Sequence, residues 1–187
     1  MKKEEILRIF ARTSVIPAER IFLRKMQKKD AVDMYDYARR PLVTRYLLWN
    51  PHPDLQYTKR YLAYVEACYR MGKFFDLAII ERTTDRMIGT CGFTRFDFQN
   101  NAAEIGYVLH PDYWNRGIAT EAAKALMQYG FAELELHRME ARYMVENQAS
   151  RRVMEKCGMR FEGVLHAAML IKDRYEDIGL CAKIKEN

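Results

Sequence analysis

The sequence predicts a mixed α+β domain with a predominantly antiparallel sheet flanked by helices. The 187 residues are 49% hydrophobic, 30% charged and 12% aromatic, which suits one globular domain and excludes intrinsic disorder. In the middle of the chain, three apolar runs of strand length follow one another with turn-like segments between them. Later, strands and helices alternate irregularly, so the order differs from a parallel βαβ repeat.

Each element of the first part is predicted by a local signal. Alternating or continuous apolar runs indicate strands, and apolar residues three or four apart indicate helices. Two prolines placed two residues apart exclude a helix over residues 49–54. The predicted elements are a helix at 3–12, a strand at 21–26, a helix at 30–40, a loop at 49–54, and a helix at 55–73 with Gly72 as its C-terminal cap. On the last helix, Tyr61 and Tyr64 are expected to face the core.

The second part continues with the same signals and brings the predicted strands to seven. No internal repeat or Gly/Ser-rich linker marks a boundary, so we expect one domain over 1–187 with an N-terminal helical extension over 1–18. The predicted elements are strands at 74–80, 87–93 and 105–109, a helix at 118–134, a strand at 140–145, a helix at 149–156, and a final hairpin of 164–171 and 178–184.

Composition excludes several classes of protein. No apolar stretch is long enough to span a membrane, and the acidic N-terminus does not resemble a secretory signal, so we expect a cytoplasmic protein with no membrane partner. The four cysteines form no Cys-x-x-Cys pair, which argues against zinc ribbons and dithiol chemistry. The net charge of +6 fits a nucleic-acid partner, an anionic cofactor or solubility alone.

The glycines and histidines exclude further chemistry. No Gly-x-Gly-x-x-Gly fingerprint is present, and Gly158 and Gly163 lack the Lys-Ser/Thr that completes a nucleotide P-loop. No histidines are paired at metal-ligand spacing, so no metal site is expected. The basic residues are dispersed without an aromatic platform, so direct nucleic-acid binding is not expected.

The segment from Ile105 to Ala122 carries the clearest chemical pattern. A strand containing Gly106 ends in a loop that runs through Arg116 and Gly117 into an Ala-rich helix. The first amides of a helix lack carbonyl partners and lie at the positive end of its dipole, so such a turn can bind a pyrophosphate. An ordinary strand–loop–helix connection has the same spacing, and the spacing alone leaves both interpretations open.

Two blocks resemble signatures of the GNAT superfamily of N-acetyltransferases. The block WNRGIA at 114–119 resembles its coenzyme A signature, Gln/Arg-x-x-Gly-x-Gly/Ala. The wider stretch 113–122 resembles the RimJ/RimL branch, which acetylates N-terminal amines of ribosomal proteins; Trp114 in place of Gln or Arg is typical of that branch. The block NQASRRVMEKCGM at 147–159 resembles the family's downstream Asn-x-x-Ser…Gly-Phe block. The resemblance extends over about residues 20–184.

The resemblance implies a GNAT fold whose seven-stranded sheet is splayed between its fourth and fifth strands, with acetyl-CoA in the split. Gly106 is expected to form a bulge that bends its strand. Backbone groups of Val108 and Leu109 would pair with the pantetheine arm, and helix-start amides would bind the pyrophosphate. The residues assigned to acetyl-CoA are Val108, Leu109, Asn115, Arg116, Gly117, Ile118, Ala119, Thr120 and Asn147. The cluster Arg151, Arg152 and Lys156 either approaches the 3′-phosphate or forms an exposed basic face.

Direct transfer to an amine requires a neutral nucleophile. An α-amine is about 14% neutral at pH 7 and a lysine about 0.04%, so an N-terminal amine needs only a modest base. Glu104, a lone carboxylate at the start of an apolar strand, stands where the family often has its base; a solvent-facing strand residue is the alternative. Met154 occupies the family's usual tyrosine position, so Ser150 is expected to protonate the leaving thiolate, with Tyr143 and Tyr107 in reserve. Ser150 as a simple helix-start residue is the alternative.

The resemblance also suggests where an acceptor binds, without identifying it. Trp49 and His52 flank the proline-rich loop where relatives position the acceptor, and either packing or binding explains them. The acceptor is expected to be a protein N-terminal α-amine, such as that of a ribosomal protein. A polyamine, an antibiotic or an amino acid is an alternative, as is a non-catalytic acyl-CoA-binding module. An acidic pocket would favour polycations, and the loop offers one carboxylate, Asp54. Monomer and homodimer both stay open.

Overall fold

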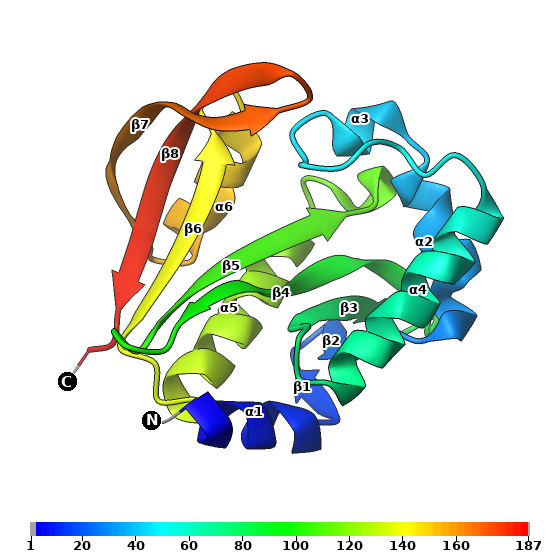
Figure 1. The fold of residues 1–187 in the computed structure, drawn as a ribbon, viewed down its shortest axis with the longest axis horizontal. Helices are drawn as coiled ribbons and strands as arrows, with labels where there is room; N and C mark the ends of the chain where they lie inside the picture. Colours follow the sequence, from blue (N-terminus) through cyan, green and yellow to red (C-terminus); the bar gives the residue numbers. More distant parts are fainter. Residues whose placement is uncertain (1–2, 187) are drawn as a thin grey trace.

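The computed structural model describes residues 3–186, in which eight strands form one sheet in the order β1-β2-β3-β4-β5-β6-β8-β7 (Figure 1). Every neighbouring pair is antiparallel except β5 and β6, so the predicted mixed class and mostly antiparallel sheet are confirmed. The strands are β1 Val15–Pro17, β2 Ile21–Arg24, β3 Asp76–Glu81, β4 Met87–Asp97, β5 Ala102–Leu109, β6 Arg138–Met144, β7 Arg160–Ile171 and β8 Arg174–Ile184.

The α-helices occupy the segments that the periodicity predicts, with one short addition. They are α1 Lys3–Arg12, α2 Ala31–Ala38, α3 Pro41–Thr44, α4 Leu55–Arg70, α5 Ile118–Ala132 and α6 Gln148–Lys156. Two 3-10 turns, η1 Lys28–Asp30 and η2 Pro111–Tyr113, complete the set. The single turn of α3 was not predicted, because four residues are too few for periodicity to reveal a helix.

The expected count of seven strands misses β1. Three residues ending in proline carry too little pattern to identify a strand, but they pair with β2 at the edge of the sheet. The N-terminal segment is therefore a helix followed by an edge strand. Ile6 and Phe10 of α1 are buried in the main core. Counting β1, the sheet opens between its fifth and sixth strands.

Two cores lie on opposite faces of the sheet. Along β3, Leu77 and Ile79 belong to the larger core with α1 and α5, whereas Ala78 and Ile80 belong to a second core with α2 and α4. This alternation is the two-residue period of a strand buried on both faces. The second core supports the region where acceptor binding is expected.

Helix α4 differs from its predicted orientation. The Asp54 carboxylate caps the helix by accepting a hydrogen bond from the amide of Tyr57. The buried stripe is Thr58, Leu62, Val65 and Cys68. Tyr61 packs against the second core, in agreement with the expectation, and also lines a cavity, whereas Tyr64 is 62% exposed and the expectation for it is wrong.

Within the described residues, no helix combines the length and apolar character needed to cross a membrane. The same residues contain no group of three or more His, Cys, Asp and Glu side chains suited to a metal ion. The four cysteines are buried and free.

Candidate functional site

Strands β5 and β6 separate partway along their length and leave a split in the sheet. Their register joins residues 102–105 of β5 to residues 138–141 of β6. Beyond Ile105 the two strands diverge, and β6, β8 and β7 lean away from the rest of the sheet (Figure 1). The outer half of β5 therefore has a free backbone edge.

The register between β4 and β5 decides which backbone groups face this split. The amide of His110 donates to the carbonyl of Ile88, so the His110 backbone faces β4. Neighbouring residues of a strand direct their backbone groups to opposite edges, so Val108 also faces β4, whereas Tyr107 and Leu109 face the split. This geometry corrects the expected pairing at Val108, whose side chain instead lines a cavity.

The bulge beside the split lies on a different strand from the one expected. Gly106 keeps regular register with Gly92, and the register shift falls on β4 between Phe93 and Arg95. A Cβ at Gly106 would lie 2.8 Å from the methyl carbon of Thr94. Glycine at position 106 thus permits close packing and does not form a bulge.

The loop after β5 presents unbonded amides at the start of α5. Gly117 has a φ of +78°, a left-handed conformation that favours glycine. The first hydrogen bond within the helix runs from the Glu121 amide to the Gly117 carbonyl, and no side chain caps the helix at Gly117. The preceding amides of Ile118, Ala119 and Thr120 are therefore the donors that a helix start leaves free. They are the kind of donors that the anion-binding interpretation of this turn requires.

Arg20, in the connection between β1 and β2, anchors this loop. Its backbone amide and Nε donate to the two carboxylate oxygens of Glu121 at 2.6 and 2.7 Å, and Nη1 donates to the carbonyl of Arg116 at 2.9 Å. The Trp114 indole donates to the Leu109 carbonyl at 2.7 Å. These bonds fix both ends of the loop, and no spacing rule pointed to Arg20.

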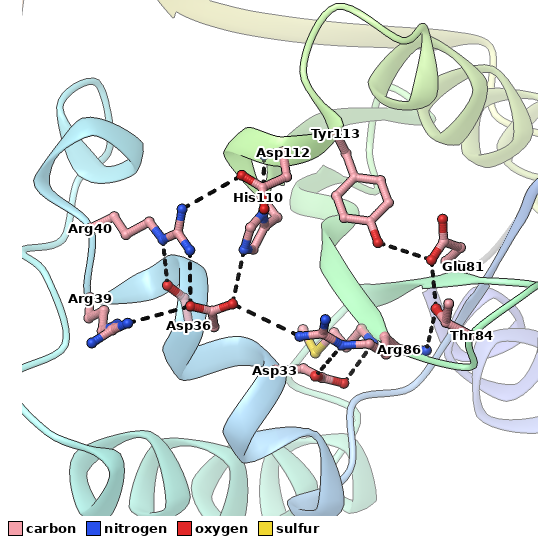
Figure 2. Close-up of polar contacts among 11 residues, drawn as sticks. Asp33, Asp36, Arg39, Arg40, Glu81, Thr84, Arg86, His110, Asp112 and Tyr113 are labelled. Atoms are coloured by element: carbon pink, nitrogen blue, oxygen red, sulfur yellow. Dashed lines mark hydrogen bonds and ion pairs between the residues drawn. The ribbon is translucent and has the colours of Figure 1, made fainter.

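A polar network ties the same loop to α2 and to the β3–β4 turn (Figure 2). His110 is buried; its Nδ1 accepts from the Asp112 amide, and its Nε2 lies 3.1 Å from Asp36 Oδ2. Nε2 therefore carries the proton donated to Asp36. Burial by itself would raise the pKa of Asp36, but hydrogen bonds from Arg40 and His110 outweigh it and lower that pKa. Further contacts run from Arg86 to Asp33 and Asp36, and from Tyr113 to Glu81.

A cavity of about 410 Å³ lies beside the split. It brings together Trp49, His52, Glu104, Val108, Asn147 and Ser150 among the predicted site residues. Leu109 and the predicted residues 115–120 do not line it, because they belong to the far end of β5 and the loop beyond. The predicted residues thus form two groups, one at the anion-binding turn and one around the cavity.

Glu104 lies in the cavity wall, but it is not the lone carboxylate that the sequence suggested. Its Oε2 is 3.2 Å from Nε of Arg142 and 4.0 Å from Nε of Arg95. Arg142 Nε has no hydrogen bond with good geometry among the described residues, so its contact with Glu104 is an ion pair. The ion pair with Arg142 orients the Glu104 carboxylate, and its oxygens are still able to accept a hydrogen bond.

Ser150 is joined to Tyr107 where α6 begins. Asn147 Oδ1 caps α6 by accepting from the Ser150 amide, so the Ser150 hydroxyl is not used for capping. That hydroxyl lies 2.9 Å from the Tyr107 phenol oxygen, and the phenol also donates to the Ser150 carbonyl at 2.9 Å. Burial raises the pKa of Tyr107 well above its usual range, so the phenol stays protonated. The two hydroxyls form a proton-holding pair beside the cavity.

Aromatic side chains build the opposite wall. The His52 ring lies 5.3 Å from that of Trp49, 4.8 Å from Tyr57 and 5.8 Å from Tyr61, measured between centroids. His52 Nδ1 is 2.9 Å from the hydroxyl of Thr58. Burial lowers the pKa of His52, so the ring is uncharged near neutral pH.

Sequence reasoning missed Asp76, the first residue of β3. Its carboxylate lines the cavity, and Oδ1 accepts from the Leu77 amide at 3.0 Å. Burial raises its pKa to about 7, although hydrogen bonds from Thr90 and Leu77 lower it in part. A carboxylate at the start of an apolar run is the signal that singled out Glu104, and it applies equally to Asp76.

The raised pKa makes Asp76 a source of pH-dependent instability. An unfolded aspartate titrates near 3.9, so the folded protein binds more protons between about pH 4 and 7, and stability falls as pH rises through that window. We expect Asp76→Asn to match the parent protein at about pH 4 and to exceed it above pH 7 by on the order of 1–4 kcal/mol. Urea unfolding across this range measures the difference. Asp85→Asn, at an exposed turn position, is the control; equal curves for the parent and Asp76→Asn would contradict the assignment.

Comparisons with known proteins agree with this arrangement. The family described as "Acetyltransferase (GNAT) domain" matches residues 20–160. An uncharacterized N-acetyltransferase p20 from Bacillus licheniformis is 35% identical over 167 residues, which are 89% of this chain and 94% of that protein. The crystal structure of a GNAT-family acetyltransferase from Bacillus anthracis superposes with a TM-score of 0.82 at 31% identity, covering 92% of this chain and 99% of that one.

Two relatives from Escherichia coli carry named acceptors. A ribosomal-protein-serine acetyltransferase is 35% identical over 100 residues, covering 54% of this chain and 56% of that protein. A spermidine N(1)-acetyltransferase is 25% identical over 173 residues, covering 88% and 86%. The relatives therefore differ in acceptor while sharing acetyl transfer.

Proposed function

The chain belongs to the GNAT family and is an acetyltransferase, and on that premise we propose that it acetylates a protein N-terminal α-amine by direct attack in a ternary complex with acetyl-CoA. The open backbone edge of β5, next to a helix start with unbonded amides, is the observation that carries the proposal. The 35% identity with a ribosomal-protein-serine acetyltransferase supports this acceptor class. The buried free thiols suit a reducing compartment, so we propose the cytoplasm as its location.

The split has the donors that acetyl-CoA requires. We propose that the amides of Ile118, Ala119 and Thr120 bind the pyrophosphate, with Gly117 allowing its close approach. Asn115 and Arg116 complete that loop. Tyr107 offers its backbone amide and carbonyl to the pantetheine arm, and Leu109 offers its amide, because the Leu109 carbonyl already accepts from the Trp114 indole. The Oδ1 atom of Asn147 accepts the capping hydrogen bond of α6. The side-chain amide nitrogen of Asn147 is therefore free to donate to the pantetheine arm from the β6 side.

Glu104 is the proposed general base. It lines the cavity at the edge of β5 where the bulge on β4 interrupts regular pairing. An α-amine is about 14% neutral at pH 7, so a carboxylate acting directly or through one water is sufficient. Arg142 and Arg95 orient it toward the acceptor. No metal ion is needed in this scheme.

Ser150 is the proposed donor to the departing thiolate. Its hydroxyl lies 2.9 Å from the Tyr107 phenol oxygen, which holds it in place at the start of α6. We expect Ser150→Ala to lower kcat about 10-fold while the Kd for acetyl-CoA changes less than 3-fold, because only the departing thiolate loses a donor. Stopped-flow turnover and calorimetry measure the two quantities. Ser14→Ala replaces the chain's other, exposed serine as a control, and an unchanged kcat in Ser150→Ala would refute the role.

A polyamine acceptor is the second candidate, favoured by one observation. The cavity holds two carboxylates, Asp76 and Glu104, of which Glu104 is paired with Arg142. Among the residues that the structure describes, Asp76 has no such cationic partner, and it suits a positively charged group of a polycation. Asp54, the carboxylate that the loop sequence offered, is occupied in capping α4. The 25% identity with a spermidine N(1)-acetyltransferase extends over most of both chains.

An acceptor panel tests the proposal. The protein is incubated with acetyl-CoA and either peptides with free N-termini, the same peptides blocked at the N-terminus, or spermidine, and the released thiol is measured. Release with free but not blocked peptides supports the first candidate. Release with spermidine alone supports the second, and coenzyme binding without turnover of any amine favours a non-catalytic acyl-CoA-binding module.

A further inference from the structure

We propose that Asp76 binds a second, positively charged nitrogen of the acceptor and so selects acceptors with two cationic groups. The inference rests on the proposed amine acetylation and narrows its substrate class. The second nitrogen can belong to a polyamine or to a basic side chain near a peptide N-terminus. The shared chemistry is an ammonium or guanidinium group some distance from the reacting amine.

Two glycines lie between Asp76 and the reaction site, and the methyl group of Thr94 packs against the second of them. Asp76 pairs with Gly92, and Gly92 pairs with Gly106, so the three residues form one row across β3, β4 and β5 on the same face. A Cβ at Gly92 would lie 2.7 Å from Asp76 Oδ1 and 2.2 Å from its Cα. The carboxylate thus occupies space that any other residue at position 92 would fill. The row from Asp76 to β5 carries no side chain beyond Asp76 itself.

The Asp76 carboxylate accepts hydrogen bonds from Leu77 and Thr90 but has no cationic partner within residues 3–186. Among the described residues, no lysine, arginine or histidine contributes to the pKa of Asp76. The hydroxyl of Tyr37 also lines the cavity, is fully buried and has no hydrogen-bond partner in the described part of the chain. Buried polar atoms are normally paired, so this unpartnered hydroxyl, in the same cavity as a carboxylate without a counter-ion, indicates an absent ligand. An ammonium has three donors, enough for a carboxylate and a phenol oxygen.

The surroundings suit a cation. Tyr37 and Tyr61 line the same cavity as Asp76, and the carboxylate contributes to raising the pKa of both phenols. Both rings, with those of Tyr57 and Trp49, line the cavity, and aromatic faces attract cations. The His52 ring is uncharged near neutral pH, so it does not repel a cation in this cavity.

The distance between Asp76 and β5 excludes direct contact of the Asp76 carboxylate with the reacting nitrogen of the acceptor. Two strand intervals separate its backbone from that of Gly106, or roughly 10 Å. Glu104 is on β5 itself, at the edge of the split. An acceptor whose reacting amine is beside Glu104 therefore reaches Asp76 only with a second group, several bonds away.

The test compares matched acceptors on two variants. 1,4-Diaminobutane is compared with butylamine, and a Ser-Lys peptide with a Ser-Gln peptide. Asp76→Asn keeps the size and can still accept from Leu77, and Tyr37→Phe removes only the unpartnered hydroxyl; Asp85→Asn makes the same charge change at the exposed turn. We call the acceptor pair that the parent protein acetylates the active pair. We expect Asp76→Asn to lower kcat/KM about 10- to 100-fold for the dicationic member of this pair and less than 3-fold for its monocationic partner. Tyr37→Phe acts in the same direction, and Asp85→Asn has no effect.

Calorimetric binding of the dicationic compounds separates this inference from the proposed function. Dication binding that Asp76→Asn abolishes, without turnover of any amine, would support the subsite and refute acetylation of these amines. Turnover with no preference for dications, equal losses for both members of a pair, or no effect of Asp76→Asn on binding would each overturn the subsite. The active pair identifies which kind of acceptor supplies the second nitrogen. Turnover of diaminobutane indicates a polyamine, and turnover of the Ser-Lys peptide indicates a peptide with a basic side chain near its N-terminus.

Discussion

Glu104→Gln is expected to lower kcat/KM for the amine acceptor by 10²- to 10⁴-fold at pH 7, the usual range for loss of a general base. Glutamine keeps the size of the side chain and can still contact Arg142, but it cannot accept the proton of the attacking amine. The loss should shrink at higher pH, where more of the acceptor is already neutral. Steady-state kinetics from about pH 6 to 9 measure it.

Glu140→Gln is the matched control for this variant. Glu140 stands directly beside Glu104 in the β5–β6 register and is likewise paired with an arginine, Arg138. It does not line the cavity described above. Kinetics close to those of the parent are expected for Glu140→Gln. Full activity of Glu104→Gln over the whole pH range would remove Glu104 from the mechanism.

Gly117→Asp is expected to weaken acetyl-CoA binding more than 100-fold with little loss of stability. Aspartate is among the few residues that tolerate a φ of +78°, and a negative charge near a helix start is favourable. The same carboxylate stands beside the free amides of Ile118, Ala119 and Thr120, where it competes with and repels a pyrophosphate. Calorimetry with acetyl-CoA measures the binding, and thermal unfolding measures the fold.

Gly158→Asp controls for backbone strain and added charge. Gly158 has the same φ of +78° after α6, and its nearest neighbour is the flexible end of Lys183. An aspartate there is disfavoured by the dipole at the C-terminal end of α6, so Gly158→Asp should lose at least as much stability as Gly117→Asp. Its coenzyme binding should fall less than 10-fold. Equal losses of binding in the two variants would show that the effect is not specific to the α5 turn.

Local signals predicted the chemistry of the α5 turn because that site is continuous in sequence. Gly117, the helix that follows it and the strand before it occupy neighbouring positions, and each leaves its own pattern. The same holds for Asn147 and Ser150 at the start of α6. What local pattern missed was the support of these groups: the anchor from Arg20 and the network through Asp36 and His110 join residues far apart in the chain.

Other differences have the same cause. Whether Val108 or Leu109 faces the split depends on the pairing of β5 with β4, and a shift of one residue would exchange them. The stripe of α4 that is buried depends on how the helix packs on the sheet, so the tyrosine at position 64 was misplaced.

The order of most strands and helices, the glycine turn at the start of α5 and the acetyltransferase family are properties that the sequence alone determined, because periodicity, glycine conformations and short motifs are local. Only the tertiary structure decided that Asp76, Glu104 and Ser150 share one cavity, that Arg142 accompanies Glu104, and that Tyr37 has no hydrogen-bond partner among the described residues. These relations arise when β3, β5, β6 and α2 pack together, and distances between segments far apart in the chain have no counterpart in local spacing.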